Sequence, residues 1–284
     1  MKTPISPAGS WTRPGDDVAD PGTHPRGIPP PLPLPARGRE IPYVVHSALN
    51  DHLPHHSPQG GEILYIVHSV WLKTYAPRVL AVFVLLIVAT VLAGLAIRAW
   101  APAFDLHAIQ AVAAHRTAGL TRLTSVLTAL GSLVILSPLA AIAAALLWRW
   151  DRHRDALVLV TVVVGSALLA TLTKVIVARP RPPVEHLTEV SSHSFPSEHA
   201  VQAAAIYLAL ALLLGRSWPA PWQRVLIGTA LVLAVVVAGS RVYLGVHYPT
   251  DVTAGLVVGW IWSWLLVGQA QNDEKHVMKS KGTG

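Results

Sequence analysis

Three short clusters of ionisable and hydroxyl side chains stand out in the sequence, because each lies at the edge of a long apolar segment. Ionisable groups at the boundary of a membrane are costly and usually mark a functional site. In chain order the clusters are Lys174 with Arg181-Pro182, then Pro196-Ser197-Glu198-His199, and then Ser240-Arg241 with His247 and Asp251. Their residue types predict a site that binds an anion and carries out acid–base or nucleophilic chemistry.

The cations of the first and third clusters predict a phosphate ligand. Lys174, Arg181 and Arg241 have few acidic residues near them in the sequence, and three cations in one pocket repel one another unless an anion neutralises them. A guanidinium group binds two phosphate oxygens at once, and an ammonium group adds a point charge. We expect these three side chains to bind a phosphate group.

The third cluster has the spacing expected of a nucleophilic histidine. Pro249 lies between His247 and Asp251, and proline is favoured in the first turn of a helix. His247 should therefore lie just before a helix whose first turn contains Asp251. A carboxylate on one ring nitrogen fixes the tautomer and leaves the other nitrogen free to attack.

The second cluster predicts the start of a helix that faces the same anion. Ser197 suits the N-cap position, and the free N–H groups of a helix N-terminus bind anions. His199 follows two residues later. A second histidine on the far side of a phosphate protonates the leaving oxygen, and such general acid catalysis contributes roughly 10²–10⁴-fold to a rate.

The elements that must position these clusters are membrane-spanning helices. The chain is 52% hydrophobic and only 13% charged, which is unusual for a soluble domain. A spanning helix needs about 20 mostly apolar residues. The candidate spans are 79–97, a stretch within 123–148, 156–177, 200–214, 225–239 and 252–267. The sequence thus predicts an all-α bundle of six transmembrane helices in residues 79–268.

The segments outside these spans have other compositions. Residues 1–60 are rich in proline and polar residues, which predicts a disordered cytoplasmic tail. Apolar residues at helical spacing predict a juxtamembrane interfacial helix in residues 61–78, and residues 269–284 are predicted to be a short basic cytoplasmic tail. Residues 104–122 have the pattern of an amphipathic helix on the membrane surface, with Asp105 among its polar residues.

Positive charges orient the bundle, because short cytoplasmic loops carry an excess of Lys and Arg. Three basic groups share one face if there are six spans: Arg149, Arg152 and Arg154, then Arg216 and Arg224, then Lys275, Lys279 and Lys281. We expect that face to be cytoplasmic and the three clusters to be extracytoplasmic, in the plasma membrane of a bacterium. The net charge of +7 suits contact with an anionic leaflet.

Together the clusters resemble the phosphatidic acid phosphatase type 2 superfamily, whose members include acid phosphatases and vanadium haloperoxidases. The family pattern is Lys-x6-Arg-Pro, Pro-Ser-Gly-His and Ser-Arg-x5-His-x3-Asp. The chain matches it with Lys174 and Arg181-Pro182, Pro196-Ser197-Glu198-His199, and Ser240-Arg241 with His247 and Asp251. The spacing agrees throughout, and the resemblance covers residues 79–268.

This resemblance implies a membrane lipid phosphatase that hydrolyses a lipid phosphate such as phosphatidic acid, or a polyprenyl diphosphate such as undecaprenyl diphosphate. It implies that His247 forms a phosphohistidine, that Asp251 orients His247, and that His199 protonates the leaving group and then activates water. The phosphate-binding residues implied are Lys174, Arg181, Ser197, Glu198 through its backbone, and Arg241. No metal or other cofactor is implied, because fixed cations stabilise the developing charge.

The chain departs from the family pattern at Glu198, which replaces the usual glycine. Glycine lets a backbone approach a ligand closely, whereas a carboxylate beside a phosphate is repulsive unless it pairs with a cation. Some family members that resemble undecaprenyl diphosphate phosphatases also carry an acidic residue here. One hypothesis is that Glu198 selects a diphosphate or positions a cation near it. The alternative is that Glu198 points outward while its N–H group binds the ligand as glycine would.

Plainer interpretations and other activities stay open at this point. Alone, an Arg-Pro pair can anchor a helix end, Pro-Ser-x-His can start a helix, and His-x3-Asp can be a surface pair. Three such coincidences in chain order favour a single site. Two alternatives to hydrolysis are transfer of the phosphoryl group to a lipid or glycan hydroxyl, and binding and transport of a lipid phosphate without catalysis. Transporters place polar groups near the midplane, whereas the predicted spans here have apolar centres.

Composition argues against several other classes of protein. The chain has no cysteine, which excludes disulfides, thiolate metal sites and cysteine nucleophiles. It has no basic stripe interleaved with aromatic residues, so nucleic acid is a poor partner. His186 and His193 lie near His199, but their spacing fits no zinc signature. The expected partners are a membrane lipid substrate and the lipid bilayer, and the sequence leaves the oligomeric state undetermined.

Overall fold

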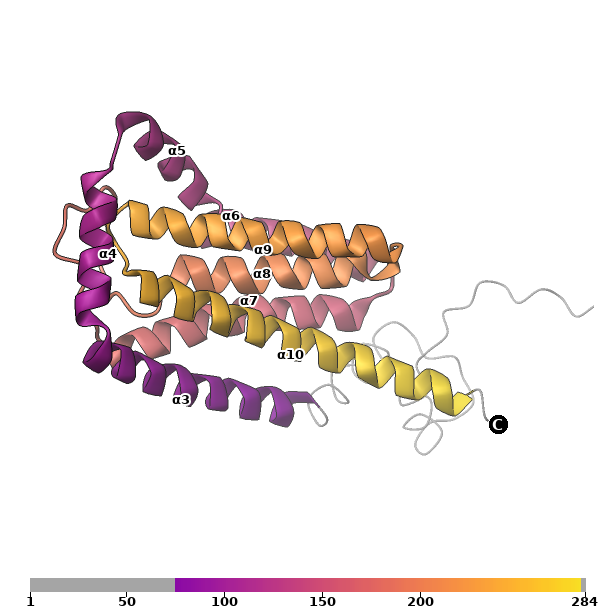
Figure 1. Ribbon diagram of the computed structural model, residues 1–284. Helices are drawn as coiled ribbons and strands as arrows, with labels where there is room; N and C mark the ends of the chain where they lie inside the picture. The colour runs from indigo at the N-terminus through magenta and orange to yellow at the C-terminus, as the bar shows by residue number, and fades with distance from the viewer. Residues whose placement is uncertain (1–74, 282–284) are drawn as a thin grey trace, which may run out of the picture. The chain divides into compact units, whose positions relative to one another are not determined.

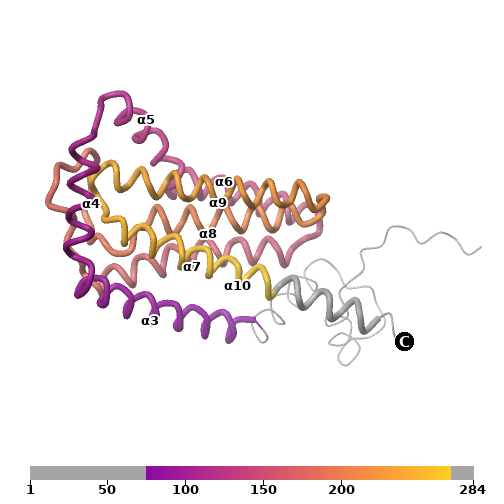
Figure 2. The backbone as a smooth tube through the Cα atoms, in the orientation of Figure 1, coloured from indigo at the N-terminus to yellow at the C-terminus, as the bar shows by residue number. Residues whose placement is uncertain are grey.

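The computed structural model describes residues 75–281, with side chains described for residues 75–269. Every regular element in this range is helical (Figures 1 and 2). The elements are α3 (Ala76–Trp100), α4 (Pro102–Ala114), α5 (Ala118–Ala129), α6 (Leu133–Arg149), α7 (His153–Val177), α8 (Glu198–Leu214), the 3₁₀ helix η2 (Gly215–Ser217), α9 (Ala220–Tyr243) and α10 (Pro249–Lys281). The predicted tail at 1–60 and all but the end of the predicted helix at 61–78 lie outside the described residues and stay predictions.

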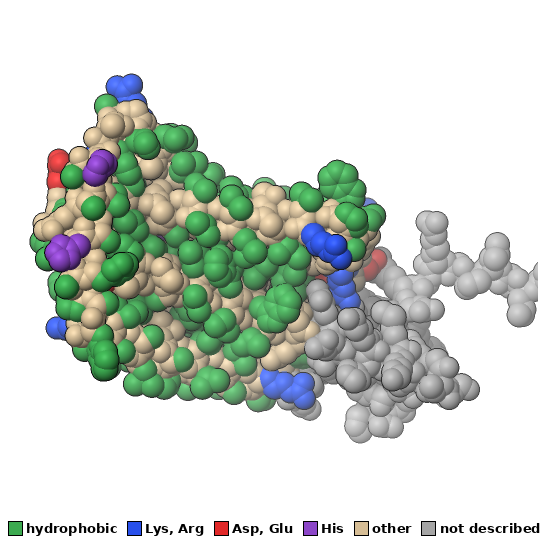
Figure 3. Space-filling view, viewed as in Figure 1, with side chains coloured by type: hydrophobic (Ala, Val, Ile, Leu, Met, Phe, Trp, Pro, Cys, Tyr) green, Lys and Arg blue, Asp and Glu red, His purple; other side chains and the backbone are tan. Residues whose placement is uncertain are grey.

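Five described helices are long and apolar enough to cross a membrane. They are α3, α7, α8 with η2, α9 and the first part of α10, and the bent pair α5 and α6 adds a sixth if it counts as one span. The helices around the bundle expose large apolar side chains such as Leu80, Leu85 and Leu92 of α3. Hydrophobic side chains cover the length of the bundle on the face in Figure 3. Soluble monomers rarely expose so large an apolar surface, and the fold is that of a multi-pass membrane protein.

The second predicted span differs from a single continuous helix. α5 and α6 meet at an angle of 40° across the break at residues 130–132. A Cβ atom added at Gly131 would lie 2.3 Å from Val237 and 3.3 Å from His199. Glycine has a low helix propensity and here lets the chain pass close to α8 and α9. α6 alone has 17 residues, fewer than the roughly 20 that a spanning helix needs.

α8 is the central helix of the bundle. Thirteen of its 17 residues are buried, and it packs against α6, α7, α9 and α10. Two glycines of α10 allow the tightest of these contacts. A Cβ atom added at Gly259 would lie 2.4 Å from the Val201 carbonyl oxygen, and one at Gly255 would lie 3.0 Å from the Ser197 carbonyl oxygen. Small residues of this kind let transmembrane helices approach closely, and this approach brings the start of α10 to the start of α8.

α4 lies across the end of the bundle where α3 ends and α10 begins (Figure 1), and it packs against α3, α9 and α10. The sequence predicts one surface helix over residues 104–122, with Asp105 on its polar face. That prediction is wrong in two respects. The helix ends at Ala114, and Asp105 is fully buried together with Ile109 one turn later. A polar side chain can face inward here because an arginine of the bundle lies beneath it and pairs with it.

The opposite end of the bundle carries the connections from α6 to α7 and from α8 to α9. Arg152 donates a hydrogen bond to the Leu213 carbonyl oxygen at 2.6 Å, and Asp155 lies 2.6 Å from Arg152 and 3.6 Å from Arg216. Two of the predicted basic groups therefore share one end of the bundle, as span counting predicts. Exposed tryptophans also lie at helix ends, where their rings suit the membrane interface: Trp100, Trp148, Trp150, Trp218 and Trp222.

Candidate active site

The C-terminal end of α7 and the loop after it supply the first cluster. Lys174 lies in the last turn of α7 and is 3% exposed. The chain leaves the helix through Ala178, which has a left-handed conformation with φ 47°. The following loop then crosses the end of the bundle, where Arg181 donates hydrogen bonds to the carbonyl oxygens of Ser192 at 2.7 Å and Val246 at 2.6 Å. These two contacts fix the guanidinium group beside the third cluster.

The end of α9 and the start of α10 supply the third cluster. Arg241 lies in the last turn of α9. The connecting loop turns at Gly245, where φ is 79° and an added Cβ atom would lie 2.6 Å from the Glu185 carbonyl oxygen, so only glycine fits. His247 then precedes α10, and Asp251 lies in the first turn of that helix, as the spacing predicts.

His247 is buried between a carboxylate and a guanidinium group. Its Nδ1 atom lies 3.7 Å from Asp251 Oδ2, which is longer than a hydrogen bond. Its Nε2 atom lies 3.4 Å from Arg181 Nη1. A guanidinium nitrogen can only donate, so Nε2 accepts and the ring proton belongs on Nδ1, which faces Asp251. Burial lowers the pKa of His247 to about 4, against the opposing effect of Asp251, and the ring is neutral at pH 7.

The structure brings the three predicted phosphate-binding cations together. Lys174 and Arg241 are both close enough to Arg181 for electrostatic repulsion, and Lys174 is also repelled by Arg241. Lys174 Nζ donates a hydrogen bond to Ser192 Oγ at 3.2 Å, and Arg241 Nη1 donates one to Thr128 Oγ1 at 3.0 Å. The buried Nε atom of Arg241 has no partner among the described residues. This excess of positive charge favours an anionic ligand.

Glu198 lies against one of these cations. Its carboxylate is 3.3 Å from Lys174 Nζ, and its side chain is 37% exposed. This geometry favours the hypothesis that Glu198 positions a cation over the alternative that it points away from the site. The repulsion expected between a carboxylate and a bound phosphate is reduced by this ion pair.

Ser197 and His199 begin α8 and complete the site. Ser197 occupies the N-cap position, but its hydroxyl does not cap the helix, contrary to the usual role of such a residue. Instead the hydroxyl is buried with no partner in the described part of the chain, which leaves it available to a ligand. The charges of Arg241, His247, Lys174 and Arg181 act on His199, which lies near the three cations.

Several residues that support Asp251 were missed by the sequence analysis. Ser194 Oγ and the Tyr248 N–H group donate hydrogen bonds to Asp251 Oδ2, and Arg179 Nη1 donates to Asp251 Oδ1 at 2.5 Å. Arg179 and Pro180 form a second Arg-Pro pair directly before Arg181-Pro182, and nothing in the sequence around Ser194 indicates a role for it. The hydrogen bonds explain why Asp251 can be fully buried.

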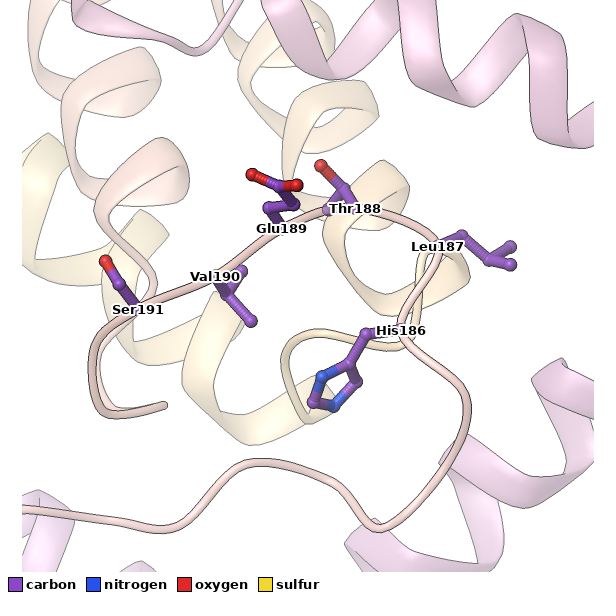
Figure 4. A pocket seen from close by; sticks show the side chains of 6 residues that line it. All are labelled: His186, Leu187, Thr188, Glu189, Val190 and Ser191. Carbon is purple, nitrogen blue, oxygen red and sulfur yellow. The ribbon is translucent and has the colours of Figure 1, made fainter.

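The loop between α7 and α8 also borders a pocket of about 900 Å³ (Figure 4). Its lining residues are His186, Leu187, Thr188, Glu189, Val190 and Ser191. The pocket ends one residue before Ser192, which contacts both Lys174 and Arg181. His186 Nε2 lies 3.0 Å from the Pro182 carbonyl oxygen. Among the described residues no group of three His, Cys, Asp or Glu side chains is arranged to hold a metal ion.

Comparison with known proteins identifies the family. A sequence model of the PAP2 superfamily matches residues 155–275. The chain is 35% identical over 144 residues to phosphatidylglycerophosphatase B of Bacillus subtilis (strain 168), an alignment that covers 50% of this chain and 71% of that protein. The chain belongs to the PAP2 superfamily. This confirms the resemblance inferred from the motifs, and with it the enzyme class, a lipid phosphatase.

Other members of the PAP2 superfamily support the same assignment. The chain is 31% identical over 107 residues to the undecaprenyl-diphosphatase BcrC of Bacillus subtilis (strain 168), covering 36% of this chain and 51% of that protein. Among solved structures, a transmembrane PAP2-type phosphatidylglycerolphosphate phosphatase from Bacillus subtilis aligns with a TM-score of 0.62 and 31% identity, over 67% of this chain and 96% of that one. This structural match confirms the predicted all-α membrane fold.

Proposed function

We propose that this PAP2 protein hydrolyses a lipid phosphate or a polyprenyl diphosphate through a phosphohistidine intermediate, without a metal ion. The observation that carries the proposal is the setting of His247, whose Nδ1 atom faces Asp251 while Nε2 faces Arg181. A neutral ring whose unprotonated Nε2 faces a phosphate-binding cation is placed to attack a phosphorus atom bound there.

The reaction proceeds in two steps. Nε2 of His247 attacks phosphorus, the bond from phosphorus to the leaving oxygen breaks, and that oxygen takes a proton from His199, which enters the reaction in its protonated form. In the second step His199 accepts a proton from water, the water oxygen attacks phosphorus, and the bond to Nε2 breaks. Inorganic phosphate leaves and His247 returns to its neutral form. Throughout, Lys174, Arg181 and Arg241 stabilise the charge on the phosphoryl oxygens.

The substrate class follows from the position of the site and from the family. Among the relatives are a phosphatidylglycerophosphatase and an undecaprenyl-diphosphatase, which share a phosphate or diphosphate on a membrane lipid. The site lies at the end of the bundle opposite the arginines of the two other connections. By the positive-inside rule we assign the site to the extracytoplasmic face of the plasma membrane.

Phosphate release by purified protein in detergent tests this proposal. Undecaprenyl diphosphate and phosphatidic acid are compared side by side in the presence of EDTA. We expect release from at least one lipid, loss of that release in His247→Ala, and normal release in His107→Ala, a control at an exposed histidine of α4. Transfer of phosphate to an added lipid or glycan alcohol with no free phosphate would instead indicate a phosphotransferase. No turnover of either lipid by folded protein would contradict the proposal.

A further inference from the structure

Arg179 lies outside the three clusters, yet it is a buried arginine whose side chain donates three hydrogen bonds at this end of the bundle. It is 4% exposed. Its Nη1 atom donates to Asp251 Oδ1 at 2.5 Å and to Thr250 Oγ1 at 2.9 Å. Its Nη2 atom donates to Asp105 Oδ2 at 2.7 Å. One guanidinium group therefore joins α4 to the start of α10.

The second carboxylate of this arrangement comes from α4. Asp105 accepts hydrogen bonds from the backbone N–H of Thr250 at 3.2 Å and from the Thr250 hydroxyl. The face of Arg179 also lies over the ring of Tyr248, 4.3 Å from its centroid. The residues on both sides of Pro249 are thus held against Arg179, directly after His247. A short helix across the membrane surface is connected to the nucleophile through two side chains.

The arrangement determines which way the Asp251 carboxylate points. Arg179 occupies Oδ1, and this leaves Oδ2 to face Ser194, the Tyr248 N–H group and Nδ1 of His247. Without Arg179 the carboxylate could rotate about its terminal torsion, which is soft, and exchange the two oxygens. Burial lowers the pKa of Arg179, but the carboxylates of Asp251 and Asp105 have the larger combined effect and raise it. The Arg179 guanidinium group therefore stays charged.

We propose that Arg179 and Asp105 are positioning residues of the nucleophile: they fix the Asp251 carboxylate, and through it the orientation and Nδ1–H tautomer of His247. This inference rests on the proposed function, because it assigns a role within that reaction. If Asp105 has this role, catalysis requires α4 to be packed against the bundle. The side-chain partners of Arg179 and Asp105 are each other, Asp251, Thr250 and Tyr248, and both residues reach His247 through Asp251.

A purely structural role of Arg179 and Asp105 and a positioning role predict different effects of substitution. Removal of either charge from a buried pair destabilises a protein whatever its role, so loss of stability alone does not distinguish them. A positioning role lowers kcat while KM stays within a few fold, since phosphate binding is left intact. Partners that orient metal-ligating histidines typically contribute about 10–100-fold to activity, and we expect a loss of kcat in that range.

The test uses variants of graded severity with a matched control. Arg179→Lys keeps the charge but cannot bridge both carboxylates, and Asp105→Asn keeps the size of the side chain. Arg152→Gln serves as the control, because Arg152 also pairs with an aspartate and bonds a neighbouring helix, at the opposite end of the bundle. We expect Arg179→Lys and Asp105→Asn to lower kcat by about 10–100-fold, and Arg152→Gln to lower thermal stability with kcat nearly unchanged.

A double-mutant cycle with Asp251→Asn decides the mechanism. If Arg179 acts through Asp251, Arg179→Lys should cause no further loss of kcat in the Asp251→Asn background, because coupled residues are non-additive. Fully additive losses would overturn the inference, as would kcat values equal to that of the Arg152→Gln control. Failure of the wild-type protein to release phosphate would instead count against the proposed function, so the two failures can be told apart.

Discussion

An arginine pairs with an aspartate at each end of the bundle: Arg152 with Asp155 where α6 meets α7, and Arg179 with Asp251 where α10 begins. The first arginine side chain is 22% exposed and the second only 5%. Within residues 75–269, the buried polar side-chain atoms without a partner include Ser197 Oγ and Arg241 Nε, and none belongs to the arginines and aspartate of the other end.

This difference separates a group that stabilises the bundle from a group that binds a ligand. At the end with Arg152, the buried carboxylate of Asp155 is paired with Arg152 and Arg216, as buried charges in folded proteins generally are. At the site, the cations outnumber the carboxylates that face them, and hydroxyl and N–H groups are buried without partners. Such groups are costly unless a ligand satisfies them. Substitutions made in matched pairs at the two ends test this distinction.

Among the substitutions matched between the two ends, the largest effect is expected for the general acid. His199→Ala should lower kcat by about 10²–10⁴-fold, because the leaving oxygen and the attacking water both lose their proton-transfer partner. His153→Ala is the control at the other end, where His153 packs against the Trp148 ring. Its kcat should match that of the wild-type protein. Equal kcat for both variants would remove His199 from the mechanism.

A smaller loss is expected for one phosphate-binding cation. Arg241→Ala should lower kcat/KM by about 10²–10³-fold, the range typical of a group that stabilises charge in the transition state. Arg152→Ala should leave kcat/KM nearly unchanged and lower the melting temperature instead. Steady-state kinetics and thermal unfolding of the two variants check this. A similar kcat/KM for both variants would show that the two ends do not differ as described.

The smallest effect concerns Glu198, whose carboxylate pairs with Lys174. A monophosphate must share Lys174 with this carboxylate, whereas a diphosphate has a second anionic group for the remaining cations. We therefore expect Glu198→Gly to lower the ratio of diphosphate to monophosphate turnover severalfold. Glu198→Gln, which keeps the side-chain size and removes the charge, should do the same. An unchanged ratio in both variants would leave Glu198 without a role in substrate choice.

Much of the fold follows from hydropathy, and much of the site from motif spacing. Counting spans places Lys174, Ser197 and Arg241 at one end of the bundle. Lys174 and Arg241 lie at the ends of the third and fifth predicted spans, and Ser197 lies at the start of the fourth, which runs in the opposite direction. The spacing of His247 and Asp251 around Pro249 predicts a loop residue followed by the first turn of a helix, which the structure has. These are local properties, and a single sequence is enough to infer them.

The parts that were missed depend on tertiary packing. Asp105 has the periodicity of a polar residue on a surface helix, and only the position of α4 over Arg179 turns it inward. The break between α5 and α6 depends on contacts that Gly131 makes with α8 and α9, although the Gly131-Ser132 pair was a usable signal. Hydropathy cannot distinguish an aspartate that faces lipid head groups from one that pairs with a buried arginine.

Trapping the covalent intermediate is the most direct test of the central claim. Protein mixed with a lipid substrate labelled in the hydrolysed phosphate is quenched in alkali, which preserves phosphohistidine, and the labelled peptide is identified by mass spectrometry. The account predicts label on His247 and none in His247→Ala. Release of phosphate by protein that carries no label, or label on another residue, would contradict it and indicate direct attack by water or a different nucleophile.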